Sequence, residues 1–310
     1  MTIENTQLTP VKGYDTKRII FSDPISGVIP DSKPKIEFKR INISSRNEDG
    51  SVGELVFPTT RLFSFGVSEN KSQETGRVNG YTFPLCLWHR DGASDEEKEW
   101  TSTFEKVVET CVDYLVKNKE EIDQYDLSRA DLLKGKGGLN PLYWKKEKFV
   151  NEHGKSGMRV IPGTGPTLYT KLIYSKKHDK FLSQFFDQNG DTVDPLQLMN
   201  KYCYTKAAIK IESIFIGNKI SLQVKLYEAV IEPTSNGMRR LLENERPVSQ
   251  SKVLSVESLG FADNPLELDN DNDEDGSIIA DGDDDDDKEK NDTPVVAPRK
   301  VKRTVRKAST

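Results

Sequence analysis

The sequence has few of the residues that build disulfide frameworks and metal centres. It contains three cysteines and three histidines among 310 residues. The cysteines are an odd number, lie far apart in the sequence and are flanked by apolar residues: Cys86, Cys111 and Cys203. This pattern is typical of reduced cysteines inside an intracellular protein. No two histidines have the spacing of metal ligands. The sequence therefore predicts no disulfide and no metal site.

Catalytic and membrane signals are also missing. Gly135–Gly138 resembles a phosphate-binding loop, but a glycine follows the lysine and no strand precedes the segment. The acidic run 269–276 lacks the flanking helices of a calcium loop. No apolar stretch approaches the roughly 18 residues of a membrane span, and none resembles a signal peptide. We expect a soluble intracellular protein without catalytic residues, cofactors or membrane contact.

Charge is unevenly distributed along the chain. The net charge is −5, yet residues 263–292 hold fifteen acidic and two basic residues, and residues 299–307 hold six basic and no acidic ones. Without these two stretches, residues 1–262 carry 37 basic and 35 acidic residues. The folded part is thus slightly basic. The boundaries we predict are a loosely ordered N-terminal arm over 1–35, a core over 36–233, a linker over 234–262 and a disordered acidic-then-basic tail over 263–310.

Hydrophobic periodicity predicts an α+β fold built on antiparallel sheet. Residues 95–118 form the clearest element, an amphipathic helix opened by a capping box at Ser94 and Glu97. A tight turn at Gly217-Asn218 joins two long alternating stretches, which indicates a hairpin. Alternation predicts further strands at 18–21, 36–43, 54–67, 81–88 and 167–174. Residues 181–186 and 191–193 are expected to form a hairpin tip around a turn at 187–190, followed by a short helix from Pro195 to about residue 201. Strands, a helix, a long irregular insertion (119–165, with short helical hints near 126–133) and more strands are typical of a barrel with a helix on one side.

The segment from Arg129 to Phe181 is both basic and aromatic. It has twelve basic and four acidic residues, interleaved with six aromatic ones. Cations pair with phosphates and aromatic rings stack on exposed bases, so this composition favours single-stranded nucleic acid. A hydrated lysine-rich loop is the alternative. The candidate binding residues are Lys134, Lys136, Tyr143, Trp144, Lys145, Lys146, Lys148, Phe149, Arg159, Tyr169, Lys171, Lys176 and Lys177, with 143–145 the best single group.

Four segments of the core are similar to a known family. Residues 81–88, 166–172, 208–217 and 226–229, together with the helix after the first of them, resemble the single-stranded-DNA-binding proteins of nucleocytoplasmic large DNA viruses such as poxviruses and iridoviruses. The resemblance implies an OB-like barrel, binding of single strands without sequence preference during replication or repair, no catalysis, and a location in the host cytoplasm or viral factory. It covers about residues 36–232.

The resulting hypothesis is a single-stranded DNA-binding protein, with RNA as a possible ligand and replication proteins as partners of the acidic tail. The alternatives are a structural or interaction protein, such as a virion component or an acidic chaperone-like binder, and an enzyme whose site is assembled from distant residues. The tail can act as a polyanion mimic that occupies the basic groove. The role of the cations from Arg299 to Lys307 and the oligomeric state stay open.

Overall fold

The structure is a computed structural model that describes residues 5–29, 35–71, 76–133, 138–150, 156–175 and 178–234. The linker beyond residue 234 and the predicted tail lie outside the described residues. So do four of the candidate binding residues, Lys134, Lys136, Lys176 and Lys177. No helix in the described part of the chain is long and apolar enough to cross a membrane.

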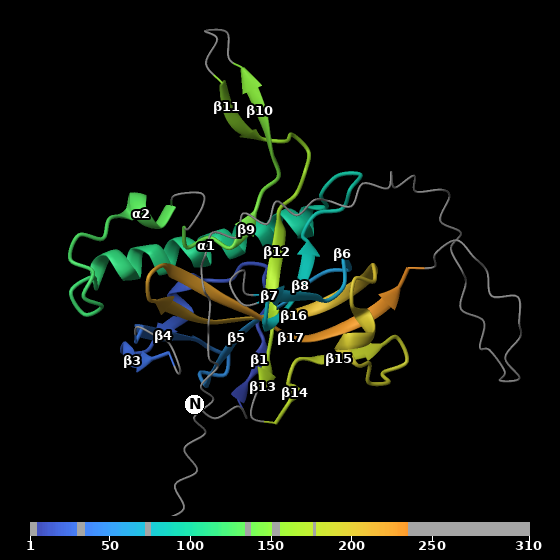
Figure 1. The fold of residues 1–310 in the computed structure, drawn as a ribbon, viewed down its shortest axis with the longest axis horizontal. Coiled ribbons are helices and arrows are strands. Elements are labelled where there is room, and N and C mark those ends of the chain that lie inside the picture. Colours follow the sequence, from blue (N-terminus) through green and yellow to red (C-terminus); the bar gives the residue numbers. More distant parts are fainter. Residues whose placement is uncertain are drawn as a thin grey trace, which may run out of the picture.

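Five strands close into a barrel (Figure 1). They are β6 (Leu62–Ser64), β8 (Val78–Cys86), β12 (Thr167–Leu172), β16 (Cys203–Ile216) and β17 (Ile220–Pro233). Around the ring the order is β6, β8, β12, β17, β16 and back to β6, and only β12 and β17 run parallel. Numbered along the chain, the ring reads 1-2-3-5-4-1, a Greek-key closure of the OB type. The predicted OB-like α+β fold is confirmed.

Further strands extend the ring at its edges. The N-terminal half adds β1 (Gln7–Leu8), β2 (Ile19–Phe21), β3 (Ile25–Val28), β4 (Glu37–Arg46), β5 (Val52–Pro58) and β7 (Ser68–Lys71). Later in the chain, β9 (Leu142–Tyr143) pairs with β12 and β15 (Gln184–Asp187) pairs with β17, whereas β13 (Tyr174–Ser175) and β14 (Lys180–Phe181) form a separate two-stranded sheet. The predicted hairpin of β16 and β17 is the longest pairing, and β4 and β5 both align on β16. The barrel interior is apolar, with Phe83, Leu85 and Leu168 fully buried.

Helix α1 (Asp95–Lys117) confirms the clearest sequence prediction. Ser94 accepts a hydrogen bond from the Glu97 amide, and the Glu97 carboxylate accepts one from the Ser94 amide. This capping box satisfies two donors that the first turn leaves unpaired. The apolar stripe that includes Phe104, Val108 and Cys111 is buried in the main core. The helix therefore covers one side of the barrel (Figure 1).

The N-terminal segment is better ordered than the sequence predicts. Short strands β1, β2 and β3 pair with β5 and β4. Tyr14 is buried, its hydroxyl lies 2.9 Å from the Ser45 hydroxyl, and its ring meets Phe57 edge-on at 5.1 Å. Backbone pairing along an existing sheet edge supplies this order, and it leaves little trace in side-chain alternation.

The insertion predicted to be irregular contains regular elements. Helix α2 (Arg129–Leu133) is held against α1 by Arg129, which pairs with Glu109 and Asp113. Strand β9 joins the barrel, and β10 (Lys146–Val150) pairs with β11 (Ser156–Val160) in a separate ribbon. This ribbon projects away from the barrel (Figure 1). After β15 the chain turns at 187–190 as predicted and forms a 3-10 helix, η3 (Pro195–Leu198), where a short helix was expected. A second 3-10 helix, η2 (Thr16–Arg18), precedes β2.

Candidate nucleic-acid interface

One row of side chains crosses five neighbouring strands on the outside of the barrel. The register pairs Tyr204 with Phe63, Phe63 with Cys86, Cys86 with Thr167, and Thr167 with Tyr143. Directly opposed residues share a face of a sheet. Four strand spacings of about 4.8 Å give the row a length of roughly 19 Å. This length suits a short run of nucleotides, since OB folds cover about 4–16 of them.

The residues that alternate with this row show that it faces outward. Leu62, Ser64, Cys203 and Thr205 flank Phe63 and Tyr204 in sequence and are buried. Leu85 and Leu168, next to Cys86 and Thr167, are fully buried as well. Because side chains alternate across a strand, the row itself lies on the outer surface. Strands two and three of the ring, β8 and β12, form the face that OB folds use for oligonucleotides.

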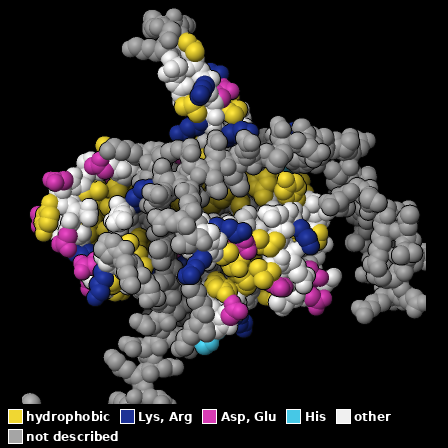
Figure 2. Space-filling model, viewed as in Figure 1, with side chains coloured by type: hydrophobic (Ala, Val, Ile, Leu, Met, Phe, Trp, Pro, Cys, Tyr) yellow, Lys and Arg dark blue, Asp and Glu magenta, His cyan; other side chains and the backbone are white. Residues whose placement is uncertain are grey.

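More rings widen the row at both ends. Phe63 makes edge-on contacts with Phe65, Tyr202 and Tyr204, with ring centroids 5.4–5.8 Å apart, and Tyr202 is 51% exposed. At the other end Tyr143 meets Tyr169 edge-on at 6.2 Å. We call Phe63, Phe65, Tyr143, Tyr169, Tyr202 and Tyr204 the aromatic face. Figure 2 shows hydrophobic side chains gathered over the barrel near β6.

Cations border the aromatic face. The Arg61 guanidinium lies 3.6 Å from the centre of the Tyr204 ring and binds both carboxylate oxygens of Glu232, at 2.7 and 2.9 Å. Lys206 is exposed two residues beyond Tyr204. On β12, Lys171 follows Tyr169 by two residues, and its Nζ donates to Gln223 at 3.1 Å. Basic side chains thus border the aromatic face on β12 and beside β16, where Arg61 is already paired with Glu232 and Lys206 is exposed.

The predicted triplet 143–145 is divided by the structure. Tyr143 is 56% exposed and Lys145 is exposed. Trp144 instead packs against the main core, edge-on to Trp88 at 5.3 Å, and Trp88 donates to the Thr101 hydroxyl at 2.9 Å. Packing therefore accounts for Trp144, which leaves Tyr143 and Lys145 as the accessible members.

The other described candidates fall on the ribbon and on β12. Lys146 and Lys148 are exposed on β10. Phe149 packs over Gly157, and Arg159 pairs with Glu147 at 2.7 Å, so both are engaged within the ribbon. Tyr169 is 36% exposed, and burial raises the pKa of its hydroxyl, which keeps the ring neutral at physiological pH.

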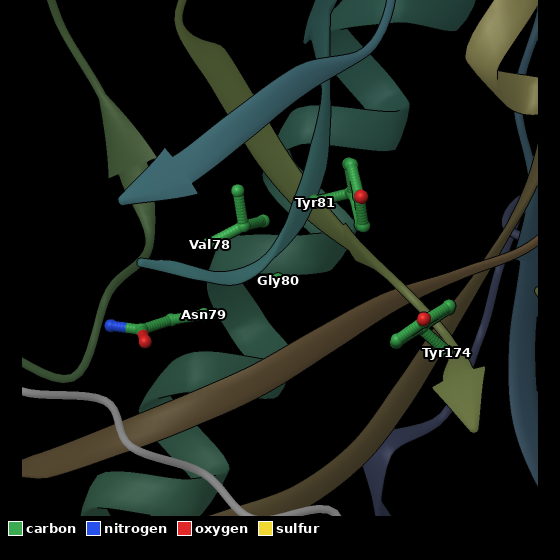
Figure 3. Close-up of a pocket in the computed structure, with 5 residues that line it drawn as sticks. All are labelled: Val78, Asn79, Gly80, Tyr81 and Tyr174. Carbon is green, nitrogen blue, oxygen red and sulfur yellow. The ribbon is translucent and has the colours of Figure 1, made fainter. Parts of the chain in front are cut away.

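A small hollow lies at the N-terminal end of β8. The hollow has a volume of about 140 Å³ and is lined by Val78, Asn79, Gly80, Tyr81 and Tyr174. Figure 3 shows the two tyrosines beside Gly80. The Tyr81 ring is edge-on to Tyr174 at 5.8 Å and to Phe181 at 5.0 Å. Tyr81 lies on the same side of β8 as the buried Phe83 and Leu85, so the hollow is not part of the outward-facing row that contains Cys86.

Comparisons with known proteins give one matching family and two viral relatives. A family described as a protein of unknown function, DUF2738, matches residues 13–274. The chain belongs to this family. Uncharacterized protein 007R of Invertebrate iridescent virus 3 is 28% identical over 57% of the chain, and the Early 31 kDa protein of Frog virus 3 (isolate Goorha) is 27% identical over 57% of it. The matches span 36% and 63% of the length of those two proteins.

Among solved structures, a remote likeness is the crystal structure of gp2.5, a single-stranded DNA binding protein encoded by bacteriophage T7. It has a TM-score of 0.32 and 11% identity, and the match covers 64% of this chain and 100% of that one.

Four of the six residues of the aromatic face are absent from the sequence-based candidates of this DUF2738 member. Phe63 and Phe65, and likewise Tyr202 and Tyr204, are spaced two residues apart, which puts each pair on one face of extended chain. That spacing was the available signal. Neither pair lies in a cluster of lysines, so the composition of the chain favours 129–181 instead.

Proposed function

We propose that the protein binds single-stranded nucleic acid, foremost DNA, across the aromatic face and acts by binding rather than catalysis. The observation that carries this proposal is the register-matched row of outward side chains, with aromatic rings gathered at both of its ends, on the outer surface of an OB-type barrel. Exposed rings offer stacking surfaces, each worth about 1–3 kcal/mol per base. The bordering cations pair with phosphates and release counterions. The ring faces and the charges thus serve the two chemically distinct parts of a nucleotide.

The arrangement favours single strands over duplex. In a duplex the faces of the bases are already stacked on each other, so surface rings gain nothing from them. A single strand presents unstacked bases to such rings. Every base has a flat π-face, which supports binding without sequence preference. Stacking does not depend on the sugar, so RNA remains a second ligand of this proposal.

The viral relatives suggest a setting. We infer that the protein coats single strands exposed during viral DNA replication or repair, in the host cytoplasm or a viral factory. Replication proteins are the partners we expect for the acidic tail. Tyrosine and arginine are also enriched at the energetic centres of protein interfaces, so the aromatic face supports an interaction protein as the second candidate.

A titration of labelled oligonucleotides tests the proposal. Fluorescence anisotropy across salt concentrations should show that single strands bind more tightly than a duplex of the same sequence. The logarithm of affinity should fall linearly with the logarithm of salt, with a slope of about 0.7 per phosphate paired. Absence of oligonucleotide binding at low salt would contradict the proposal and favour the interaction protein.

A further inference from the structure

The ribbon of β10 and β11 is a separate projection. Its register runs from Lys146 opposite Val160 to Val150 opposite Ser156. At its base the Ile161 amide donates to the Lys145 carbonyl at 3.0 Å. Figure 1 shows it pointing away from the barrel. We call residues 145–150 and 156–160 the basic arm.

The basic arm has two different faces. On one, Arg159 pairs with Glu147, its guanidinium lies 5.7 Å from the Phe149 ring, and Phe149 covers Gly157. These contacts hold the two strands together. The other face carries side chains that are all exposed: Lys146, Lys148, Val150, Met158 and Val160.

The exposed face is unusual because it combines cations with large apolar side chains. Val150 is 70% exposed and Met158 is 57% exposed. A two-stranded ribbon is marginally stable alone in water, so exposed apolar groups on it bring no benefit to folding. A ligand that has both negative charge and apolar surface would cover this face. Figure 2 shows Lys and Arg side chains at the base of the arm.

The arm starts where the aromatic face ends. Tyr143, the last residue of the row, lies two residues before Lys145. Trp144 fixes the connection by packing on Trp88, and Gly165 allows the returning chain to pass directly beside that ring. A strand leaving the aromatic face at Tyr143 therefore passes the base of the arm.

The dimensions of the arm suit the groove of a double helix. The major groove is about 12 Å wide and 8.5 Å deep and admits a two-stranded ribbon. Five residues at about 3.4 Å each give the arm a length near 17 Å. Lys146 and Lys148 on its exposed face can reach phosphates, while Val150 and Met158 can make apolar contacts with the methyl groups of thymine. A single strand lacks such a groove.

We propose that the basic arm enters the groove of duplex DNA adjoining the single strand on the aromatic face, so that the preferred ligand is a junction of single strand and duplex. This inference rests on the proposed function and adds a substrate class to it.

Three labelled ligands test the inference with the full-length chain: a single strand, a duplex, and a duplex that continues into the same single strand. The arm variant is Lys146→Glu with Lys148→Glu. The matched control is Lys106→Glu with Lys117→Glu, which makes the same charge change on exposed positions of α1. The unfolding midpoint of the arm variant should agree with that of the unsubstituted protein, and the control should unfold slightly earlier because Lys117 is a stabilising cation in the last turn of α1.

The unsubstituted protein should bind the junction at least about tenfold more tightly than the single strand. The arm variant should lose this preference, because its affinity for the junction should fall much more than its affinity for the single strand. The slope of log affinity against log salt on the junction should fall by about 2, one unit for each lysine. The control should keep the preference. Equal affinity of the unsubstituted protein for junction and single strand would overturn the inference and leave the proposed function intact. An arm variant that weakens both ligands equally would also overturn it. Failure to bind any ligand would instead contradict the proposed function.

Discussion

Replacement of Tyr169 by alanine is the most direct test of stacking on the aromatic face. Tyr169 is 36% exposed and contacts Tyr143, another ring of the aromatic face, at 6.2 Å. Loss of one stacked base should cost about 1–3 kcal/mol of binding free energy. Each 1.4 kcal/mol is a factor of ten in Kd, so the Kd for a single strand should rise about 5- to 150-fold.

Two further variants separate stacking from other causes. Tyr169→Phe keeps the ring and removes the hydroxyl, so it should bind within about twofold of the unsubstituted protein. Tyr125→Ala removes a tyrosine that is 62% exposed in the connection between α1 and α2, away from the aromatic face, and should leave binding unchanged. Anisotropy at one fixed salt concentration measures all three. The stacking argument is refuted if Tyr169→Ala binds as tightly as Tyr125→Ala.

Three other outcomes follow from local chemistry. Ser94→Ala removes half of the capping box with Glu97 and should lower the free energy of unfolding by about 0.5–2 kcal/mol in a denaturant titration. Arg61 lowers the pKa of Glu232 below its ordinary value of 4.5, so this pair stabilises the fold above that pH and loses its effect as pH falls through the lowered pKa. Thermal melting temperatures of Glu232→Gln and the unsubstituted protein should therefore differ near pH 7 and converge at acid pH. A difference that persists at acid pH would contradict the assignment. Burial raises the pKa of Cys86 to about 11, so this half-buried thiol should react slowly with maleimide at neutral pH, and bound oligonucleotide should slow it further, as mass spectrometry of the labelled peptide can show.

The elements that the sequence predicted well are those whose signals are local. Helix α1 has a capping box and an apolar stripe over 23 residues. The β16–β17 hairpin has long alternation around one tight turn. The strands of the N-terminal segment and of the basic arm gave weaker signals, because their side chains are largely exposed and follow no pattern of burial. Pairing with a neighbouring strand, which is invisible in one segment alone, defines them.

The candidate site was predicted only in part, because some of its signals are local and others depend on contacts between distant segments. Tyr143, Tyr169 and the lysines of the arm lie in a stretch whose composition points to nucleic acid. Trp144 belongs to that stretch too, and nothing local distinguishes it from Tyr143. Its partner Trp88 is 56 positions earlier in the chain. Only the folded arrangement shows that one ring is packed and the other exposed.

The aromatic face illustrates how a surface can depend on register alone. Its rings come from β6, β9, β12 and β16 and the short segments beside them, and they align because each pairing has one specific offset. A slip of one residue in β6 would turn Phe63 into the barrel and expose Leu62 and Ser64. Those two side chains are buried, so the apolar interior fixes the offset that places the rings outside. The core of the barrel thus determines the binding surface, and changes to the rings can alter binding without changing the fold.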